Sequence, residues 1–275
     1  MTPDLTHPDL EKKDAELRAL AKGQPATKFR VLDLFSGIGG FSLGLERTGG
    51  FETVAFCEIE PFPRKVLKKH WPNVPCYEDV RTLTAERLAA DGISVDVICG
   101  GFPCQDVSNA GPRLGLAGER SGLWSEITRL VSAIRPQFVI VENVSALLGR
   151  GLHRVLGDLA EIGFDAEWHC IPASAFGAPH ARDRVWIIAY PDQEHAQRQF
   201  GGSDGSKERK EPASRPTGLL HRTGRLPSWP VEPVVGRVGH GFSNRMDRAA
   251  ALGNAVVPQI PELIGRAILE ARPHP

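Results

Sequence analysis

Short apolar runs recur along most of the chain, and stretches with helical periodicity separate them. Most of these runs are continuously apolar rather than alternating with polar residues, which is typical of strands that are buried on both faces. The pattern predicts strands over residues 29–35, 53–57, 95–99, 138–141 and 185–189. It predicts helices over residues 41–47, 61–70, 125–134, 152–162 and 259–271. Alternating strands and helices of this kind predict an α/β fold with a doubly wound, mostly parallel sheet.

The pattern changes after Tyr190. Residues 193–230 are rich in Gly, Ser, Pro and charged side chains and show little periodicity, and a regular pattern returns near residue 249. We therefore predict four segments, which are an N-terminal extension at 1–28, a main domain at 29–190, a small irregular lobe at 191–248 and a segment at 249–275 that returns to the main domain.

Composition narrows the class of protein without identifying it. Lys and Arg together number 33, as do Asp and Glu, so bulk charge offers no argument for a nucleic-acid partner, although a local basic cleft would suffice. The five cysteines are odd in number and lack CxxC spacing, which argues against a disulfide framework or a zinc ribbon and suits a reducing cytoplasm. The N-terminal residues lack the apolar core of a signal peptide, and no apolar run is long enough to span a bilayer. We expect a cytoplasmic protein with no membrane association.

A glycine-rich turn follows the first predicted strand, at residues 36–40 (SGIGG). Glycines allow a ligand to approach the backbone at the start of the next helix. The Gly-x-Gly-Gly spacing differs from that of a dinucleotide site, and no P-loop lysine follows. Glu58 ends the second strand, where an acid can hold ribose hydroxyls. Taken alone, the pattern fits equally well a tight turn with a chance acid nearby.

A cysteine follows the third predicted strand, in the sequence GGFPCQ at residues 100–105. Loops at the carboxyl ends of strands build the site in an open α/β sheet, so Cys104 would be accessible there. A single cysteine in such a chain is most often a structural thiol. We apply that interpretation to the other four cysteines, Cys57, Cys76, Cys99 and Cys170.

Polar residues occur at three more predicted strand or helix ends. Glu142 and Asn143 end the fourth strand, Arg182 and Arg184 precede the fifth, and Asn254 precedes the last helix. Each has an ordinary structural alternative. These are a solvated acid at a strand end, a surface arginine paired with a neighbouring acid, and a helix N-cap.

The motifs DLFSGIGG, CE, ED, GGFPCQ, ENV, HARDRV and LGNAVVP occur in this order between about residues 29 and 271. In this respect the chain resembles the DNA (cytosine-5)-methyltransferase family. Several separate motifs in one order make the resemblance specific. It implies the Rossmann-like fold of S-adenosylmethionine-dependent methyltransferases. In that fold, residues 29–190 would form the catalytic and cofactor-binding domain and residues 191–248 a short variable target-recognition lobe.

The resemblance implies that S-adenosylmethionine binds without a metal and leaves as S-adenosylhomocysteine. Glu58 would bind the ribose, Asp79 with Val80 would meet the adenine, and Asn254 would reach the methionine end. The complete set of implied cofactor residues is Phe35, Gly37, Gly39, Gly40, Glu58, Asp79, Val80, Leu123, Asn254, Ala255 and Val256.

The resemblance also implies the catalytic roles. Cys104 would be the covalent nucleophile at C6 of a flipped-out cytosine, Glu142 would contact N3, and Arg184 would contact O2. The implied substrate or DNA contacts are Pro103, Gln105, Asn143 and Arg182, the last of which would support its loop or contact a phosphate.

Double-stranded DNA is the implied partner, and a cognate restriction endonuclease is a second one. We expect a monomer in a bacterial or phage-type cytoplasm. The most basic local run, between residues 207 and 225, could position the duplex, although a solvated loop with no such role is the alternative.

The sequence lacks the features that would indicate three rival classes of protein. A transfer-RNA methyltransferase of this kind usually carries Cys-Phe-Thr, and an amino-methyltransferase carries Pro-Pro-aromatic. Neither sequence occurs here. A non-catalytic relative would have lost Cys104, Glu142 or the glycines, which are all present.

Overall fold

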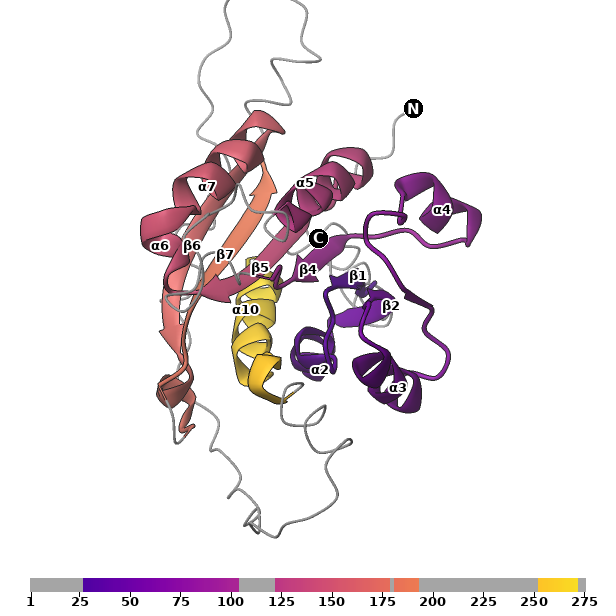
Figure 1. The fold of residues 1–275 in the computed structure, drawn as a ribbon, viewed down its shortest axis with the longest axis horizontal. Coiled ribbons are helices and arrows are strands. Elements are labelled where there is room, and N and C mark those ends of the chain that lie inside the picture. The colour runs from indigo at the N-terminus through magenta and orange to yellow at the C-terminus, as the bar shows by residue number, and fades with distance from the viewer. Residues whose placement is uncertain (1–26, 104–121, 179–180, 193–251, 272–275) are drawn as a thin grey trace, which may run out of the picture.

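The computed structural model describes residues 27–103, 122–178, 181–192 and 252–271. Within these ranges the chain forms a seven-stranded sheet of order β3-β2-β1-β4-β5-β7-β6, with helices on both faces (Figure 1). The strands are β1 Phe29–Leu34, β2 Phe51–Cys57, β3 Cys76–Tyr77, β4 Val97–Gly100, β5 Phe138–Val144, β6 Phe164–Pro172 and β7 Asp183–Pro191. The helices are α2 Gly40–Arg47, α3 Pro61–His70, α4 Ala85–Ala90, α5 Leu123–Ile134, α6 Leu147–Arg150, α7 Leu152–Glu161, the 3-10 helix η2 Ala173–Phe176 and α10 Gln259–Glu270.

Strands β1 to β5 run parallel to one another, whereas β7 lies between β5 and β6 and is antiparallel to both. The predicted doubly wound, mostly parallel sheet is therefore confirmed. The predicted fourth strand stopped at residue 141, which was three residues too early, so Glu142 and Asn143 do not lie beyond the strand. Both residues lie within β5, because ladder pairing to β7 continues to Val144.

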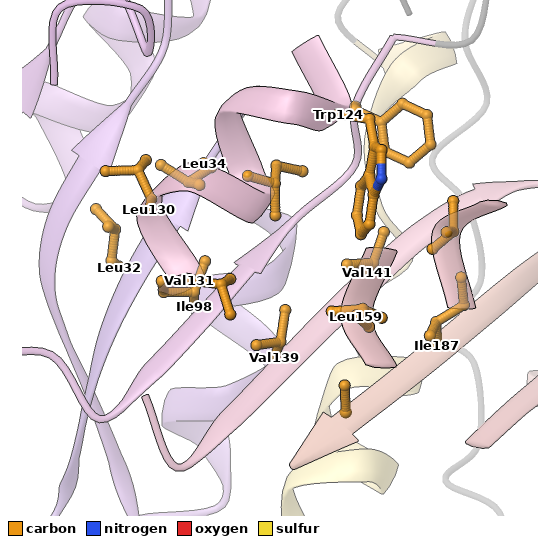
Figure 2. Packing of buried hydrophobic residues seen from close by; sticks show 14 of the residues in the cluster. Leu32, Leu34, Ile98, Trp124, Leu130, Val131, Val139, Val141, Leu159 and Ile187 are labelled. Atoms are coloured by element: carbon orange, nitrogen blue, oxygen red, sulfur yellow. The ribbon is translucent and has the colours of Figure 1, made fainter. Parts of the chain in front are cut away.

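Two apolar clusters lie on opposite faces of the sheet. On one face, α5 and α7 pack against β1, β4 and β5, and Figure 2 shows Leu130 and Val131 of α5 facing Leu32 and Ile98 of the strands. On the other face lie α2 and α10 (Figure 1). Their apolar residues form one cluster with buried side chains such as Trp186. The sheet is thus buried on both sides, as its continuously apolar strands require.

Helix α10 packs against α2, although most of the chain separates them. A Cβ atom at Gly44 of α2 would overlap the carbonyl oxygen of Pro258, and one at Gly265 of α10 would lie 3.0 Å from the Thr48 side chain. The backbones therefore approach closely because these residues are glycines. Asn254 is not the N-cap of α10, since Pro258 occupies that position without a side-chain cap bond.

The limits of the four predicted segments stay a prediction, because residues 1–26 and 193–251 lie outside the described ranges. None of the helices within those ranges combines the length and the hydropathy that a membrane span requires.

Candidate active site

The carboxyl ends of β1, β2, β4 and β5 lie at one edge of the sheet, because these neighbouring strands are parallel. This arrangement gathers most of the predicted site into one region. The glycine turn follows β1, Glu58 follows β2, the GGFP segment follows β4, and Glu142 stands near the end of β5. Cys104 and Gln105 lie outside the described residues, and their roles stay predictions.

The turn after β1 has a strained backbone. Phe35, Gly37 and Gly39 have φ values of 51°, 53° and 85° in the left-handed region, which glycine adopts most easily. A Cβ at Gly39 would lie 2.7 Å from the Trp71 ring, and one at Gly40 would lie 2.5 Å from the carbonyl oxygen of Val256. A Cβ at Gly37 would meet no atom within 4 Å. Gly39 and Gly40 thus allow close packing, whereas Gly37 borders open space that a ligand can fill.

Glu58 is held rigidly beside this turn. Its carboxylate accepts hydrogen bonds from the backbone N–H of Gly37 and from that of Glu60, both at 2.7 Å. The residue is 7% exposed. Because a carboxylate has about four acceptor positions, two remain for the hydroxyls of a ribose.

The ED motif lies next to Glu58, in the turn after β3. The backbone N–H of Glu58 donates to Tyr77 of β3 at 2.9 Å, which joins the two segments. Asp79 pairs with Arg81 at 2.8 Å, and the hydrogen bonds from Arg81 lower the pKa of Asp79. Val80 is buried in the core. Leu123, the first residue of α5, packs half-buried against the same cluster.

Glu142 and Arg184 form an ion pair across β5 and β7. Oε1 of Glu142 lies 2.9 Å from Nε of Arg184, and the glutamate side chain is 12% exposed. Burial raises the pKa of Glu142, although Arg184 and Arg182 act in the opposite direction. A Cβ at Gly101 would lie 3.0 Å from the other carboxylate oxygen. The carboxyl group therefore sits against the segment that leads to Cys104, with a pKa raised above its usual range.

Asn143 supports that segment from the other side of β5. It is 2% exposed, and its amide nitrogen donates to the carbonyl of Phe102 at 3.2 Å. Its amide oxygen accepts from the backbone N–H of Val144 at 2.8 Å. Pro103 follows and is half-buried. The buried amide therefore anchors the backbone of the loop, and its predicted contact with DNA stays a prediction.

Arg182 links the start of β7 to the C-terminal segment. Its guanidinium donates to the carbonyl of Gly253 at 2.6 Å and to that of Ala255 at 2.8 Å. Asn254 between them is exposed, and Val256 rests against Gly40. Arg182 thus supports the segment predicted to reach the methionine end of the cofactor, and its predicted role in its own loop or at a phosphate stays a prediction.

The sequence analysis missed one buried polar residue at the site, Asp33 of β1. Asp33 is fully buried, and the Ser42 hydroxyl at the start of α2 donates to its carboxylate at 2.7 Å. Burial raises the pKa of Asp33 to about 7. The available signal was an acid inside an otherwise apolar run, which predicts either a buried carboxyl group or a weakened strand.

Comparison with known proteins places the chain in a family. Residues 29–234 match the family described as C-5 cytosine-specific DNA methylase. The chain belongs to that family. This membership confirms the resemblance drawn from the order of the motifs. Members of the C-5 cytosine-specific DNA methylase family use S-adenosylmethionine as the methyl donor in general.

Two of the relatives that the chain resembles are type II methyltransferases. The type II methyltransferase M2.BsuMI of Bacillus subtilis is 36% identical over 168 residues, which are 58% of this chain and 41% of that protein. The type II methyltransferase M.Sau3AI of Staphylococcus aureus is 35% identical over 182 residues, covering 59% and 43%. The chain thus spans less than half the length of these two relatives.

Solved structures share the fold. The methyltransferase EhMeth of Entamoeba histolytica superimposes with a TM-score of 0.59 at 14% identity, covering 89% of this chain and 98% of that one. A variant of Spodoptera frugiperda DNMT2 gives a TM-score of 0.51 at 20% identity, covering 68% and 56%. At these identities the likeness concerns the fold alone.

Proposed function

We propose that this chain is a DNA (cytosine-5)-methyltransferase. It transfers a methyl group from S-adenosylmethionine to C5 of a flipped-out cytosine in duplex DNA. One observation supports this most directly. A buried carboxyl group with a raised pKa, Glu142, lies against Gly101 in the segment that leads to Cys104, and Arg184 is 2.9 Å away. A proton donor and a cation beside a nucleophile's loop suit addition to a cytosine ring.

The residues at the edge of the sheet fit the cofactor. Gly37 borders open space, Glu58 has free acceptor positions beside it, and Asp79 lies on the segment next to Glu58. We assign the ribose to Glu58, the adenine to Asp79 and Val80, and the methionine end to residues 254–256, with Phe35 and Leu123 lining the pocket. S-adenosylmethionine supplies an electrophilic methyl group when it is bound.

The chain's own side chains make C5 reactive. Addition of the Cys104 thiolate to C6 forms an S–C6 bond and turns C5 into a nucleophilic enamine carbon. Glu142 donates its proton to N3, which removes the developing negative charge, and Arg184 contacts O2. After methylation a base, for which water suffices, takes the C5 proton. The S–C6 bond then breaks, Cys104 leaves as the thiolate, and N3 returns its proton to the Glu142 carboxylate.

Double-stranded DNA is the proposed substrate. C5 and C6 are inaccessible within a base pair, so the target base must leave the stack, at a cost of a few kcal/mol. The names of the relatives above, type II methyltransferases, favour an enzyme of a restriction-modification system. We therefore propose a cognate restriction endonuclease that reads the same site. We also propose that the enzyme acts as a monomer in the cytoplasm of a bacterium or a phage host.

The test uses the purified chain, S-adenosylmethionine labelled in its methyl group, and either unmethylated duplex DNA or transfer RNA. We expect label in DNA alone, and we expect bisulfite sequencing to place it on cytosine within one short sequence. The Cys104→Ser variant is the control for contaminating activity. Label in transfer RNA, or on an exocyclic nitrogen, would replace this proposal with one of the rival classes.

A further inference from the structure

Arg129 of α5 makes contacts that the proposed chemistry does not use. Its Nη2 donates to the carbonyl of Val80 at 2.9 Å and to that of Leu83 at 2.8 Å. Its Nε donates to Glu126, one turn earlier on the helix, at 2.8 Å. A single guanidinium therefore joins α5 to two backbone carbonyls of the turn that contains Asp79 and Val80.

The turn also has local hydrogen bonds. It follows the two-residue strand β3, and Thr82 donates to the carbonyl of Asp79 through its backbone N–H at 3.1 Å and through its hydroxyl at 2.9 Å. The backbone N–H of Leu83 donates to the carbonyl of Val80 at 3.3 Å, and that of Arg81 donates to the Asp79 carboxylate at 3.0 Å. The side chains of Val80 and Leu83 are buried, which holds the turn against the core. Both bonds from Arg129 come from Nη2, whose two hydrogens have fixed directions in the guanidinium plane, whereas the hydrogens of a lysine ammonium rotate freely.

The first turn of α5 supports the segment that leads to Cys104. The Trp124 ring packs against Phe102 with centroids 5.4 Å apart, and its indole N–H donates to Asp158 at 2.8 Å. Figure 2 shows Trp124, Leu130 and Val131 of this helix over the strands. One rigid helix thus contacts the base of the proposed catalytic loop at its start and the turn of the ED motif through Arg129.

We propose that Arg129 is a positioning residue for the adenine subsite. It holds the Asp79–Val80 backbone where the carboxylate meets the 6-amino group of the base. The inference rests on the proposed function, in which that turn receives the adenine. Without Arg129 the turn shifts, so recognition of the base weakens while the ribose contact of Glu58 is kept.

The experiment measures binding to the full-length protein by calorimetry with two probes. S-adenosylhomocysteine carries the 6-amino group, and S-inosylhomocysteine carries an oxygen there. We expect wild type to prefer the first. In Arg129→Met we expect affinity for S-adenosylhomocysteine to fall roughly tenfold, as removal of charge-assisted hydrogen bonds implies, and the preference to shrink towards one. The affinity and the preference of Arg129→Lys should lie between those of wild type and of Arg129→Met. The lysine variant also provides a folded protein if the methionine variant is unstable.

Arg266→Met is the matched control, because Arg266 is an exposed helical arginine that pairs with Glu262 at 2.8 Å. It should keep both the affinity and the preference. In turnover, Arg129→Met should raise KM for S-adenosylmethionine and change kcat and the KM for DNA little. If both Arg129 variants keep the wild-type preference for S-adenosylhomocysteine, with or without a decrease in thermal stability, this inference is overturned and the proposed function is not. Failure of wild type to bind S-adenosylhomocysteine overturns the proposed function and this inference with it.

Discussion

Among single side chains, Cys104 gives the sharpest test of the chemistry, because the thiol is proposed to act on the base and not on the cofactor. We expect Cys104→Ser to lose methylation by roughly a thousandfold or more, since an alcohol replaces the nucleophile. Binding of S-adenosylhomocysteine, measured by calorimetry, should persist. Cys170→Ser is the control, because Cys170 is an exposed free thiol on β6. Equal losses of binding and turnover in Cys104→Ser would make Cys104 a structural residue.

Glu142 should impose a pH dependence on the rate. A general acid works only while it is protonated, and burial raises the pKa of this carboxyl group. We expect kcat to fall as pH rises through that pKa. Glu142→Gln should lower kcat by roughly a hundredfold or more and abolish this alkaline decline, since an amide has no proton to lose. A fully active Glu142→Gln enzyme would remove Glu142 from the mechanism.

Asp33 should make stability depend on pH. Its pKa is raised from 3.8 to about 7 by burial, so it binds its proton more tightly in the folded state than in the unfolded chain. The stability from this difference is present in full below pH 3.8 and is lost as pH rises through about 7. In Asp33→Asn that part of the pH dependence, at most ~4 kcal/mol, should vanish. Urea unfolding of both proteins at pH 5 and pH 8 measures it, and equal slopes against pH would contradict it.

The contacts of single residues were the least predictable part of the candidate site. The carboxyl ends of parallel strands lie at the same edge of a sheet, so the shared location of Glu58 and Glu142 could be predicted from the sequence. The hydrogen bonds of Arg129 to Val80 and Leu83 could not be predicted, because the acceptors are backbone carbonyl groups, which every residue carries. The same holds for the bonds of Arg182. Assignments to Cys104 and Gln105 stay predictions.

Among the elements, the contact between α2 and α10 can be tested with a glycine substitution, for which Gly157 of α7 provides the control. A Cβ at Gly44 would overlap the Pro258 carbonyl and lie 2.9 Å from Cβ of Pro261, so the helices would have to separate. We expect Gly44→Ala to destabilise the fold by about 1–3 kcal/mol.

A Cβ atom at Gly157 of α7 would meet no atom within 4 Å. Because alanine also has a higher helix propensity than glycine, Gly157→Ala should stabilise the fold by about 0.5–1 kcal/mol. Chemical denaturation of both variants provides the measurement. A neutral Gly44→Ala would show that α10 can shift freely.

Apolar patterning predicted the buried strands well and the edge of the sheet poorly. The predicted strands β1, β2, β4, β5 and β7 are continuously apolar over several residues, because both faces of each are covered. Strand β6 was missed because it lies at the edge and mixes Trp168, which is 46% exposed, with charged neighbours. The antiparallel direction of β7 could not be predicted either, because an apolar run has the same pattern in both directions.

For the molecule as a whole, the net charge of zero means that the proposed binding of DNA must rely on a local basic region. Lys207, Arg209 and Lys210 stand in the basic run of the proposed recognition lobe and lie outside the described residues. Replacing all three with Ala should weaken affinity for every DNA sequence and lower the salt slope by about one for each phosphate that the lobe no longer neutralises. Filter binding at several salt concentrations measures this, and the methylated site should not change. An unchanged slope would place DNA binding elsewhere.

The late position of α10 in the chain has a consequence for biosynthesis. The residues of the sheet face that α10 covers are synthesised long before α10 leaves the ribosome. Phe41, Leu45 and their neighbours therefore lack their contacts with α10 while residues 191–248 are being synthesised. A nascent chain stalled before Gln259 would expose this apolar surface to water and to other chains. A chaperone that binds apolar segments would therefore find its target on this face, and release would coincide with the arrival of Ile260 and Ile264.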